Sequence, residues 1–304
     1  MSASSYLEHF EDSVLGSPKL VGLLEKAIWA CLEDGKRHCA VLSGGIDSSS
    51  VVCTARSFGC DLPTFTGYYE GEAFDERPWA KLASGPDWVQ VRIMPEDFVH
   101  NFDAFAKACK PPFQGMGAFG QFMVAKAIAR KGYQIVLSGE GSDELFGGYA
   151  RQYIVAGMRR PDGYEDYELP EDYPRELAGA LEYDLERLPD LLAVDDQMLG
   201  AHGLTGKAPF TDQAIVDFAL ALPAKERVGK GVLKMAMRGL VPDAILDRTD
   251  KRGFPAPLVE WAQHDPVRSF VLDRIGYLPA PEKPWDRGWF HDMIKTSQFV
   301  EAAA

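Results

Sequence analysis

A glycine pair set between an apolar run and a helical pattern constrains the fold of this chain most. Ala40 to Leu42 is typical of a short β-strand, and it runs into the loop Ser43-Gly-Gly-Ile-Asp-Ser48. Successive glycines let the backbone approach a phosphate closely, and the N-terminus of the following helix directs N–H groups toward an anion. Ser43 and Ser48 add hydroxyl donors, and Asp47 offers a carboxylate to the Mg²⁺ that accompanies a nucleotide polyphosphate. The loop therefore predicts a nucleotide site, with an ordinary strand-to-helix turn as the alternative.

The residues after the glycines separate this loop from the other common phosphate-binding loop. That loop has the pattern Gly-x-x-x-x-Gly-Lys-Ser/Thr, whereas no lysine follows Gly44 and Gly45 here. The loop type in this chain suits cleavage of ATP at the α-phosphate, which releases pyrophosphate and leaves AMP on the substrate.

A second strand end carries a related motif about 95 residues later. A short apolar run that ends at Leu137 continues as Ser138-Gly-Glu-Gly-Ser-Asp-Glu-Leu-Phe-Gly-Gly-Tyr149. Open α/β sheets bind ligands at the carboxyl ends of their strands, so we expect both motifs in one crevice, with Asp143 and Asp47 as the metal ligands. The alternative for Asp143 is a solvated helix start, because acids favour the first turn of a helix.

Together the two motifs resemble the synthetase domain of glutamine-dependent asparagine synthetase and its relatives, among them β-lactam synthetase. The resemblance covers roughly residues 15 to 265. Further matches are Asp196, Met198, Ala201-His-Gly-Leu204, Pro209-Phe-Thr-Asp212, Lys251-Arg-Gly-Phe-Pro255 and Trp261. The resemblance implies an ATP pyrophosphatase of the N type, with a Rossmann-like fold of the adenine nucleotide alpha hydrolase kind and with ATP and Mg²⁺ as cofactors.

The resemblance also implies roles for single residues. Lys251 matches the lysine that reaches the leaving pyrophosphate, where a cation opposes the charge that develops. Glu140 matches a glutamate of members that make asparagine, whereas members that close β-lactam rings tend to have tyrosine there, and a carboxylate at this place can accept a proton from an attacking amine. For Lys251 and for the helical Lys234 a solvent-exposed lysine is the alternative, and for Glu140 a turn cap. The candidate nucleotide-binding residues are Leu42, Ser43, Gly44, Gly45, Asp47, Ser48, Thr66, Gly67, Ser138, Gly139 and Lys234.

The sequence departs from the family pattern where the acyl substrate is expected. The family's acid-Pro segment is replaced by Lys110-Pro-Pro-Phe-Gln-Gly-Met-Gly117, and its Glu-x-Arg by Thr205-Gly-Lys207. These changes remove charged groups that would bind and recognise a small amino-acid substrate. We therefore expect a carboxylate substrate other than free aspartate. The pocket is expected around Phe113, Met116 and Phe119.

The source of the amine is left open by the sequence. Family members usually carry an N-terminal glutaminase domain with a cysteine nucleophile, whereas this sequence begins Met1-Ser2-Ala3 and has no cysteine before Cys31. The amine is expected to be ammonia, from solution or from a separate glutaminase, or an amine-bearing substrate. Ring closure or ligation of a peptide carboxylate stays a close competitor, and a homodimer and a nucleotide-binding regulatory subunit stay open.

Composition narrows the class of protein further. The 304 residues are 46% hydrophobic, which is enough for a large core. A formal net charge of −13 disfavours electrostatic binding of nucleic acid over a broad surface. Five cysteines without a Cys-x-x-Cys pair indicate reduced thiols, and the sequence shows neither a signal peptide nor an apolar run of membrane length, so we expect a cytoplasmic protein without a membrane partner.

The periodicity of the chain predicts one domain over residues 1–304. Strands and helices alternate from about residue 18 to 150, which indicates a parallel sheet with right-handed crossovers and the nucleotide site. The Pro-, Asp- and Glu-rich stretch Arg159 to Arg175 is expected to be an exposed, mobile excursion. From about 176 to 304 the pattern is helical, with helices predicted at Glu176 to Leu192, Asp212 to Leu222 and Lys230 to Leu240.

Overall fold

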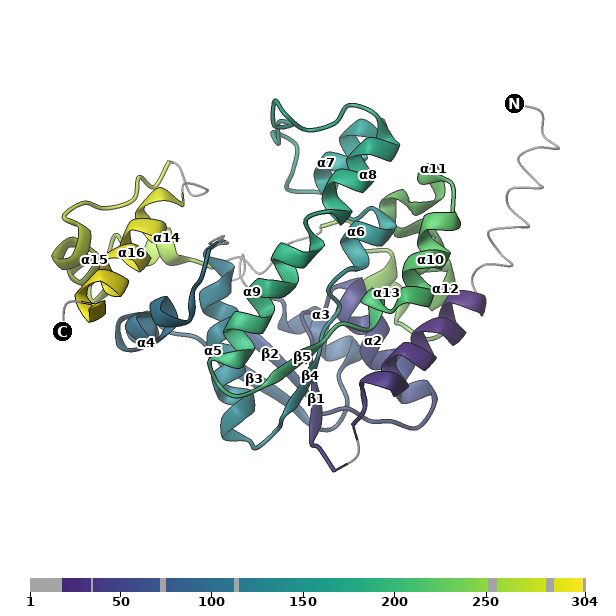
Figure 1. Cartoon of the computed structure of the whole chain (residues 1–304), viewed down its shortest axis with the longest axis horizontal. Helices are drawn as coiled ribbons and strands as arrows, with labels where there is room; N and C mark the ends of the chain where they lie inside the picture. The colour runs from purple at the N-terminus through teal and green to yellow at the C-terminus, as the bar shows by residue number, and fades with distance from the viewer. Residues whose placement is uncertain are drawn as a thin grey trace.

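A parallel five-stranded sheet forms the centre of the molecule. The computed structural model describes residues 18–33, 35–71, 75–111, 115–250, 256–282 and 287–302. The strands are β1 (His38–Val41), β2 (Thr64–Tyr68), β3 (Trp88–Arg92), β4 (Ile135–Leu137) and β5 (Thr205–Lys207), and they pair in the order β3-β2-β1-β4-β5 (Figure 1). All four pairings are parallel, which confirms the predicted Rossmann-like α/β sheet. The edge strand β5 was not predicted, because Thr-Gly-Lys lacks an apolar strand pattern.

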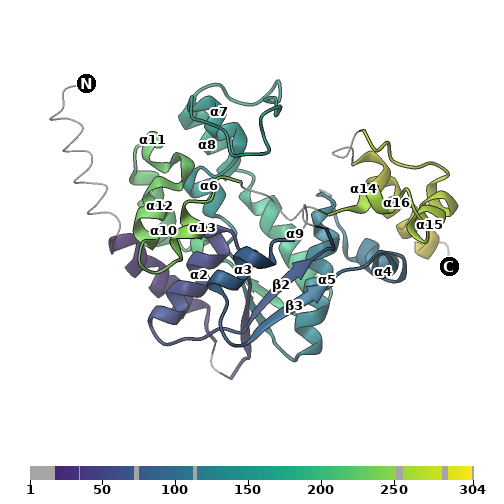
Figure 2. The ribbon, with the colours of Figure 1, turned by 180° about the vertical axis from the view of Figure 1, so that it is seen from behind.

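Successive side chains along each strand point to opposite faces of the sheet, so a hydrophobic core forms on each face. Ala40 of β1 packs on one face, whereas its neighbour Cys39 packs on the other. The first face is covered by the helix over residues 18–31, by α2 (Ile46–Ser57) and by α3 (Arg77–Ala83), as the rear view shows (Figure 2). α5 (Gly117–Arg130) and α9 (Leu188–Gly200) cover the second face.

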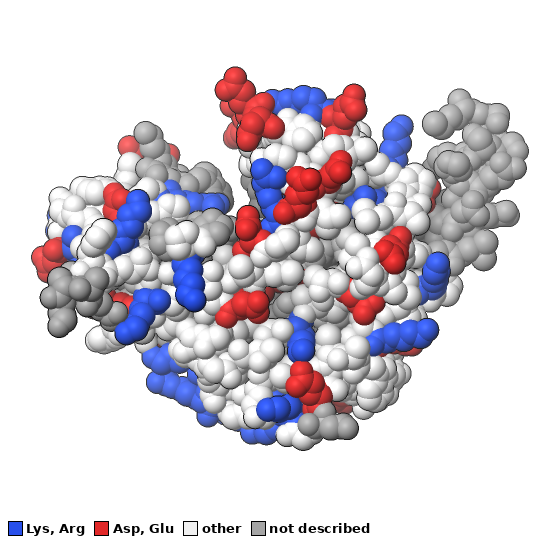
Figure 3. Space-filling model, viewed as in Figure 1, with Lys and Arg blue, Asp and Glu red and all other residues white. Residues whose placement is uncertain are grey.

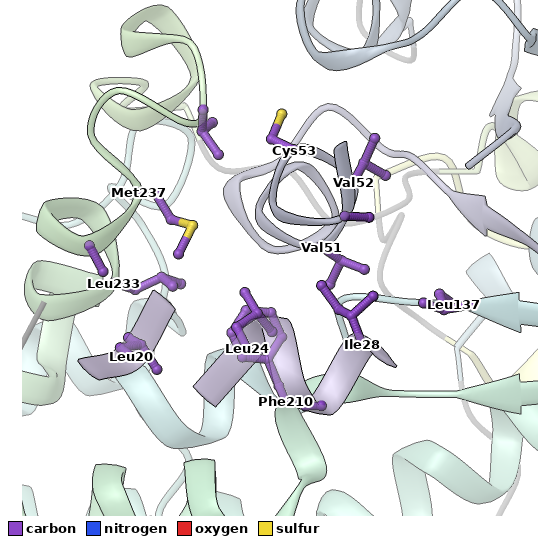
Figure 4. Packing of buried hydrophobic residues seen from close by; sticks show 14 of the residues in the cluster. Leu20, Leu24, Ile28, Val51, Val52, Cys53, Leu137, Phe210, Leu233 and Met237 are labelled. Carbon is purple, nitrogen blue, oxygen red and sulfur yellow. The ribbon is translucent and has the colours of Figure 1, made fainter. Parts of the chain in front are cut away.

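The helices after residue 200 divide between two hydrophobic clusters. α10 (Gln213–Ala221), α12 (Gly231–Met237) and α13 (Asp243–Leu246) join the core around α2, where Leu24, Val51 and Leu233 point toward one another (Figure 4). The second cluster is rich in phenylalanine and lies at the other end of the molecule. Its helices are α4 (Pro95–Ala108), α14 (Leu258–Trp261), α15 (Val267–Ile275) and α16 (Gly288–Ala302), packed with parts of α5 and α9.

The helix predicted over Glu176 to Leu192 is two helices. α8 (Leu177–Leu185) ends before Glu186, and α9 begins at Leu188. Pro189 stands at the second position of α9, where its missing N–H is tolerated, but inside a longer helix it would break the hydrogen-bond ladder. The proline therefore sets the boundary.

A buried carboxylate anchors the excursion between residues 156 and 176. Asp184 of α8 is 1% exposed and accepts hydrogen bonds from Arg151 and Gln152 of α7 (Ala150–Val155) and from the hydroxyl of the buried Tyr173, at 2.7–2.8 Å. Exposed acids cover the outside of this segment, at the top of the molecule (Figure 3). The segment is thus exposed, as predicted, but it is fixed at its base by ionic and tyrosine contacts.

The remaining short elements join these parts. They are α6 (Ser142–Phe146), η2 (Pro209–Thr211), α11 (Ala224–Arg227) and η3 (Val228–Lys230). All five cysteines are free thiols. Throughout the described ranges, no helix has the length and apolarity needed to cross a bilayer.

Candidate active site

A cavity of about 360 Å³ opens where β1 and β4 end, on the side of their carboxyl termini. β2, the next strand along the chain, pairs with one side of β1, and β4 pairs with the other side. The strand order therefore reverses at β1. Ser43, Gly45, Asp47 and Ser48 of the first motif line the cavity. So do residues of the second motif, namely Ser138, Gly139, Glu140 and Asp143. Two segments far apart in sequence therefore share one site large enough for a nucleotide-sized ligand.

Two glycines make this convergence possible. A Cβ on Gly139 would lie 2.6 Å from the backbone nitrogen of Ser48, so a larger residue would push the two motifs apart. Gly44 has φ of +82°, and a Cβ there would lie 2.5 Å from the backbone nitrogen of Ala80 in α3. Gly44 thus lets α3 pack closely against the loop.

The hydroxyls of the first motif face each other at the cavity wall. The Oγ atoms of Ser43 and Ser48 are 3.1 Å apart, and the backbone N–H of Ser43 donates to Ser48 Oγ at 3.1 Å. Both serines line the cavity. Their hydroxyls can turn toward a phosphate oxygen, because hydroxyl hydrogens rotate freely.

Lys230 joins the two acidic residues that the sequence assigned to a metal. Its Nζ lies 2.5 Å from Oδ1 of Asp143 and pairs with Asp47 as well, while the lysine side chain is almost wholly buried. Burial alone would lower the pKa of Lys230, but Asp143 and Asp47 raise that pKa above its usual value. The lysine is therefore a fixed cation at the meeting point of the two motifs.

Sequence reasoning missed Lys230, although it named Lys234 one helical turn later. Lys230 precedes α12 with φ of +58°, a left-handed conformation that a side chain other than glycine rarely adopts. Lys234 also lines the cavity, and its pKa is lowered by burial and by the positive charge of Lys230. The spacing Lys-x-x-x-Lys was the available signal, because in a continuous helix it would set both side chains on one face.

Glu140 sits in an acidic environment. Its pKa is raised well above the usual value by burial and by the charges of Asp195, Glu144, Asp143 and Asp47. Glu144 is buried and accepts a hydrogen bond from the hydroxyl of Tyr149, which makes it a structural acid. Glu140 therefore holds a proton more strongly than an exposed glutamate does.

Other candidates from the sequence take different places. Leu42 and Gly67 line the cavity, whereas the hydroxyl of Thr66 is buried against the carbonyl of Leu42 at 2.6 Å and does not. Lys251 and Phe113 lie outside the described residues. Arg248, just before Lys251, lines the cavity and donates to Glu76 at 2.9 Å.

Met116 and Phe119, two of the residues expected around the acyl pocket, lie away from the cavity. Neither residue lines the cavity, and Phe119 is fully buried among other phenylalanines. The helical period of α5 explains this, since it turns Phe119 away from the face that carries Gln121, Val124 and Ala125.

The donor set fits Mg²⁺ brought by a nucleotide rather than a metal cage made by protein alone. Within the described ranges no group of three or more His, Cys, Asp or Glu side chains is arranged to hold a metal. Asp47 and Asp143 both reach the cavity, and Mg²⁺ commonly binds through one or two carboxylates plus phosphate oxygens. Lys230 neutralises part of their charge between them.

A nucleotide-sized cavity at the switch point of a parallel sheet, with two glycine loops, two acids and a buried lysine, is the arrangement expected of a nucleotide-binding α/β protein. The chain belongs to the asparagine synthase family, whose model matches residues 19–299.

Curated relatives carry names from the same family. The chain is 27% identical to asparagine synthetase [glutamine-hydrolyzing] 1 of Bacillus subtilis, over 74% of this chain and 47% of that protein. A putative asparagine synthetase [glutamine-hydrolyzing] of Mycobacterium bovis is 25% identical over 79% of this chain and 48% of its own length. Asparagine synthetase [glutamine-hydrolyzing] 3 of B. subtilis is 23% identical over 99% of this chain and 60% of its own length. The chain thus spans about half the length of the curated relatives it matches.

Proposed function

We propose that this chain is an ATP-dependent amide synthetase that forms AMP and pyrophosphate. A substrate carboxylate attacks the α-phosphorus of ATP, and the bond to pyrophosphate breaks. An amine then attacks the carbonyl carbon of the acyl-adenylate, the bond to AMP breaks with its electron pair leaving on AMP, and the amine nitrogen loses one proton. The observation that carries this proposal is the convergence of the two motifs on one cavity, with Lys230 between Asp47 and Asp143.

The position of each residue in the cavity indicates its role in the reaction. The N–H groups and hydroxyls of the Ser43 to Ser48 loop, with Lys230 and Lys234, hold phosphate oxygens, and Lys251 acts on the leaving pyrophosphate. Positioning of the two reactants and neutralisation of phosphate charge supply most of the rate increase. Asp47 and Asp143 would hold Mg²⁺, which withdraws electron density from the phosphates. Once its own carboxyl is ionised, Glu140 accepts a proton from the amine.

Free aspartate is not the carboxylate in this proposal. Lys207 stands where the family has its arginine, and its Nζ pairs with Glu33 at 3.0 Å on the edge strand, without lining the cavity. Thr205 does not line the cavity either. Two positions that carry charge in the family therefore contribute no charge to the site, which supports a less acidic or bulkier carboxylate.

The test is a screen for pyrophosphate release with MgATP, a panel of carboxylates and ammonia or primary amines. We expect AMP and pyrophosphate in equal amounts with at least one carboxylate, and little or no asparagine from aspartate. Stoichiometric ADP would overturn the reaction type. Turnover of aspartate at about 1 s⁻¹ or more would overturn the substrate assignment. A product with an internal amide, detected by mass spectrometry, would favour the ring-closing alternative.

A further inference from the structure

Helices α5 and α9 form part of the wall of the cavity. The lining residues that these two helices contribute are Gln121, Val124, Ala125, Asp195, Met198 and Leu199. Four of the six side chains are apolar, so the polar character of this part rests on Gln121 and Asp195. Sequence reasoning assigned no role to Asp195.

Asp195 holds a fixed place on this wall. One of its oxygens, Oδ1, accepts a hydrogen bond from Nε2 of Gln121 at 2.9 Å, which ties α9 to α5. Burial raises the pKa of Asp195 to about 7, with a further contribution from the charge of Asp196. Its carboxyl is therefore poised to gain or lose a proton near neutral pH.

Glu140 lines the same cavity from the second motif. Asp195 is the charged neighbour that acts most strongly on Glu140, ahead of Glu144, Asp143 and Asp47, and all four are acids. The nearby cation Lys230 is taken by Asp47 and Asp143. A second cation close to Glu140 and Asp195 would relieve the repulsion between their two charges.

We propose that Glu140 and Asp195 form the subsite for the amine substrate, and that this substrate is a primary alkylamine bound as its ammonium ion. The assignment rests on the proposed function and names the amine of that reaction. The ammonium head lies between the two carboxylates, and the alkyl group lies against Val124, Ala125, Met198 and Leu199. Gln121 positions Asp195.

The proton balance of the reaction matches two carboxylates. A primary ammonium ion must lose one proton before its nitrogen attacks the acyl carbon and a second one as the amide forms. Glu140 and Asp195 can each take one, while the electron pair of the broken bond leaves with AMP. Both protons pass to solvent after the product departs. Asp195 is thus a second proton acceptor beside Glu140.

Amine binding can be measured without turnover by calorimetry on the full chain with ATP and Mg²⁺. The probes are n-butylammonium, ammonium and n-butanol. We expect n-butylammonium to bind at least about tenfold more tightly than either other probe, because only it uses both the carboxylates and the apolar wall. Asp195→Asn and Glu140→Gln should each weaken it by about tenfold or more. Asp190→Asn, an exposed acid on the same helix, is the matched control and should change nothing.

Proton release on amine binding, and the pH dependence of that binding, distinguish a binding role of Asp195 from a purely structural one. Cation binding favours the ionised carboxyls, so n-butylammonium should release protons and bind more tightly as the pH rises through about 7. The charged groups around the pair are Asp196 on α9, Glu144 and Asp143 on α6, Asp47 on α2 and the two lysines near α12. The pH dependence should shrink in Asp195→Asn.

Three outcomes would overturn the inference: equal binding of butanol and butylammonium, an ammonium affinity as high as that of butylammonium, or no difference between Asp195→Asn and Asp190→Asn. Each can occur while AMP and pyrophosphate are still formed, so the proposed function would survive. Conversely, amine binding without any AMP formation across the carboxylate panel would contradict the proposed function but still support the amine-binding site.

Discussion

The ammonium group of Lys230 lies 2.5 Å from Oδ1 of Asp143 and also pairs with Asp47, so one buried cation holds together the acids of two distant motifs. Removal of this cation leaves two neighbouring carboxylates uncompensated. We expect Lys230→Met to lower the free energy of unfolding by about 3 kcal/mol, as measured by urea denaturation. The unbranched methionine keeps the length of the side chain and leaves the backbone requirement at this position unchanged.

Lys225 offers a control for this experiment, because it is an exposed lysine a short distance earlier in the chain. Lys225→Met should change the free energy of unfolding by less than about 0.5 kcal/mol. Equal stability of the Lys230→Met variant and the parent would show that the cation does not compensate the two acids.

Asn in place of Asp47 or Asp143 should separate metal binding from folding. Each change removes one carboxylate from the Mg²⁺ position, while Lys230 keeps the other as its partner. Turnover should fall about 100-fold or more, and the Mg²⁺ concentration for half-maximal pyrophosphate release should rise. Asp87→Asn, an exposed acid away from the cavity, is the control. Variants that keep full activity with the same Mg²⁺ dependence would place the metal elsewhere.

The raised pKa of Glu140 predicts a cost in stability at neutral and alkaline pH. Because its folded pKa lies above the unfolded value of about 4.3, the folded protein holds a proton that the unfolded chain has lost. This contribution is complete below the unfolded pKa and disappears as the pH rises through the folded pKa. Thermal unfolding should therefore show that the stability of Glu140→Gln, relative to that of the parent, increases as the pH rises above the unfolded pKa of about 4.3.

The exposed Glu182 gives the matched comparison for that pH series. Glu182→Gln should follow the parent at every pH, since its carboxyl meets water in both states. A constant offset between Glu140→Gln and the parent would contradict the raised pKa of Glu140.

Asp184 should decide whether the excursion stays folded. Asp184→Ala leaves the guanidinium of Arg151 and the hydroxyl of Tyr173 without their buried acceptor. We expect a loss of about 3–5 kcal/mol, and faster tryptic cleavage after Arg159 or Arg175. Asp166→Ala, on the exposed side of the same segment, should leave the cleavage rate unchanged. Parent-like cleavage of Asp184→Ala would mean that other contacts hold the segment.

Local patterns were enough to predict the central sheet without its edge strand β5, and to predict both motifs. A strand that ends in a glycine loop is visible within ten residues, and parallel pairing follows from strand and helix alternation. Lys230 could not be found this way, because a lysine beside a helix looks the same whether it meets solvent or two acids from other segments. Asp195 is similar, since its neighbour Gln121 comes from another helix. Phe119 was misplaced because its helical face was not compared with that of Gln121.

The phenylalanine-rich cluster at the far end of the molecule shares α5 and α9 with the cavity. One face of each helix lines the cavity at the proposed amine subsite, while Phe119 of α5 and Val194 of α9 pack against α4 and α14–α16. In the described part of the chain, no residue after Arg248 lines the cavity. Directed evolution of amine selectivity therefore has two kinds of target. Besides the wall itself, it can alter the remote aromatic packing, which would reset the spacing of the two helices without touching a single group that meets the substrate.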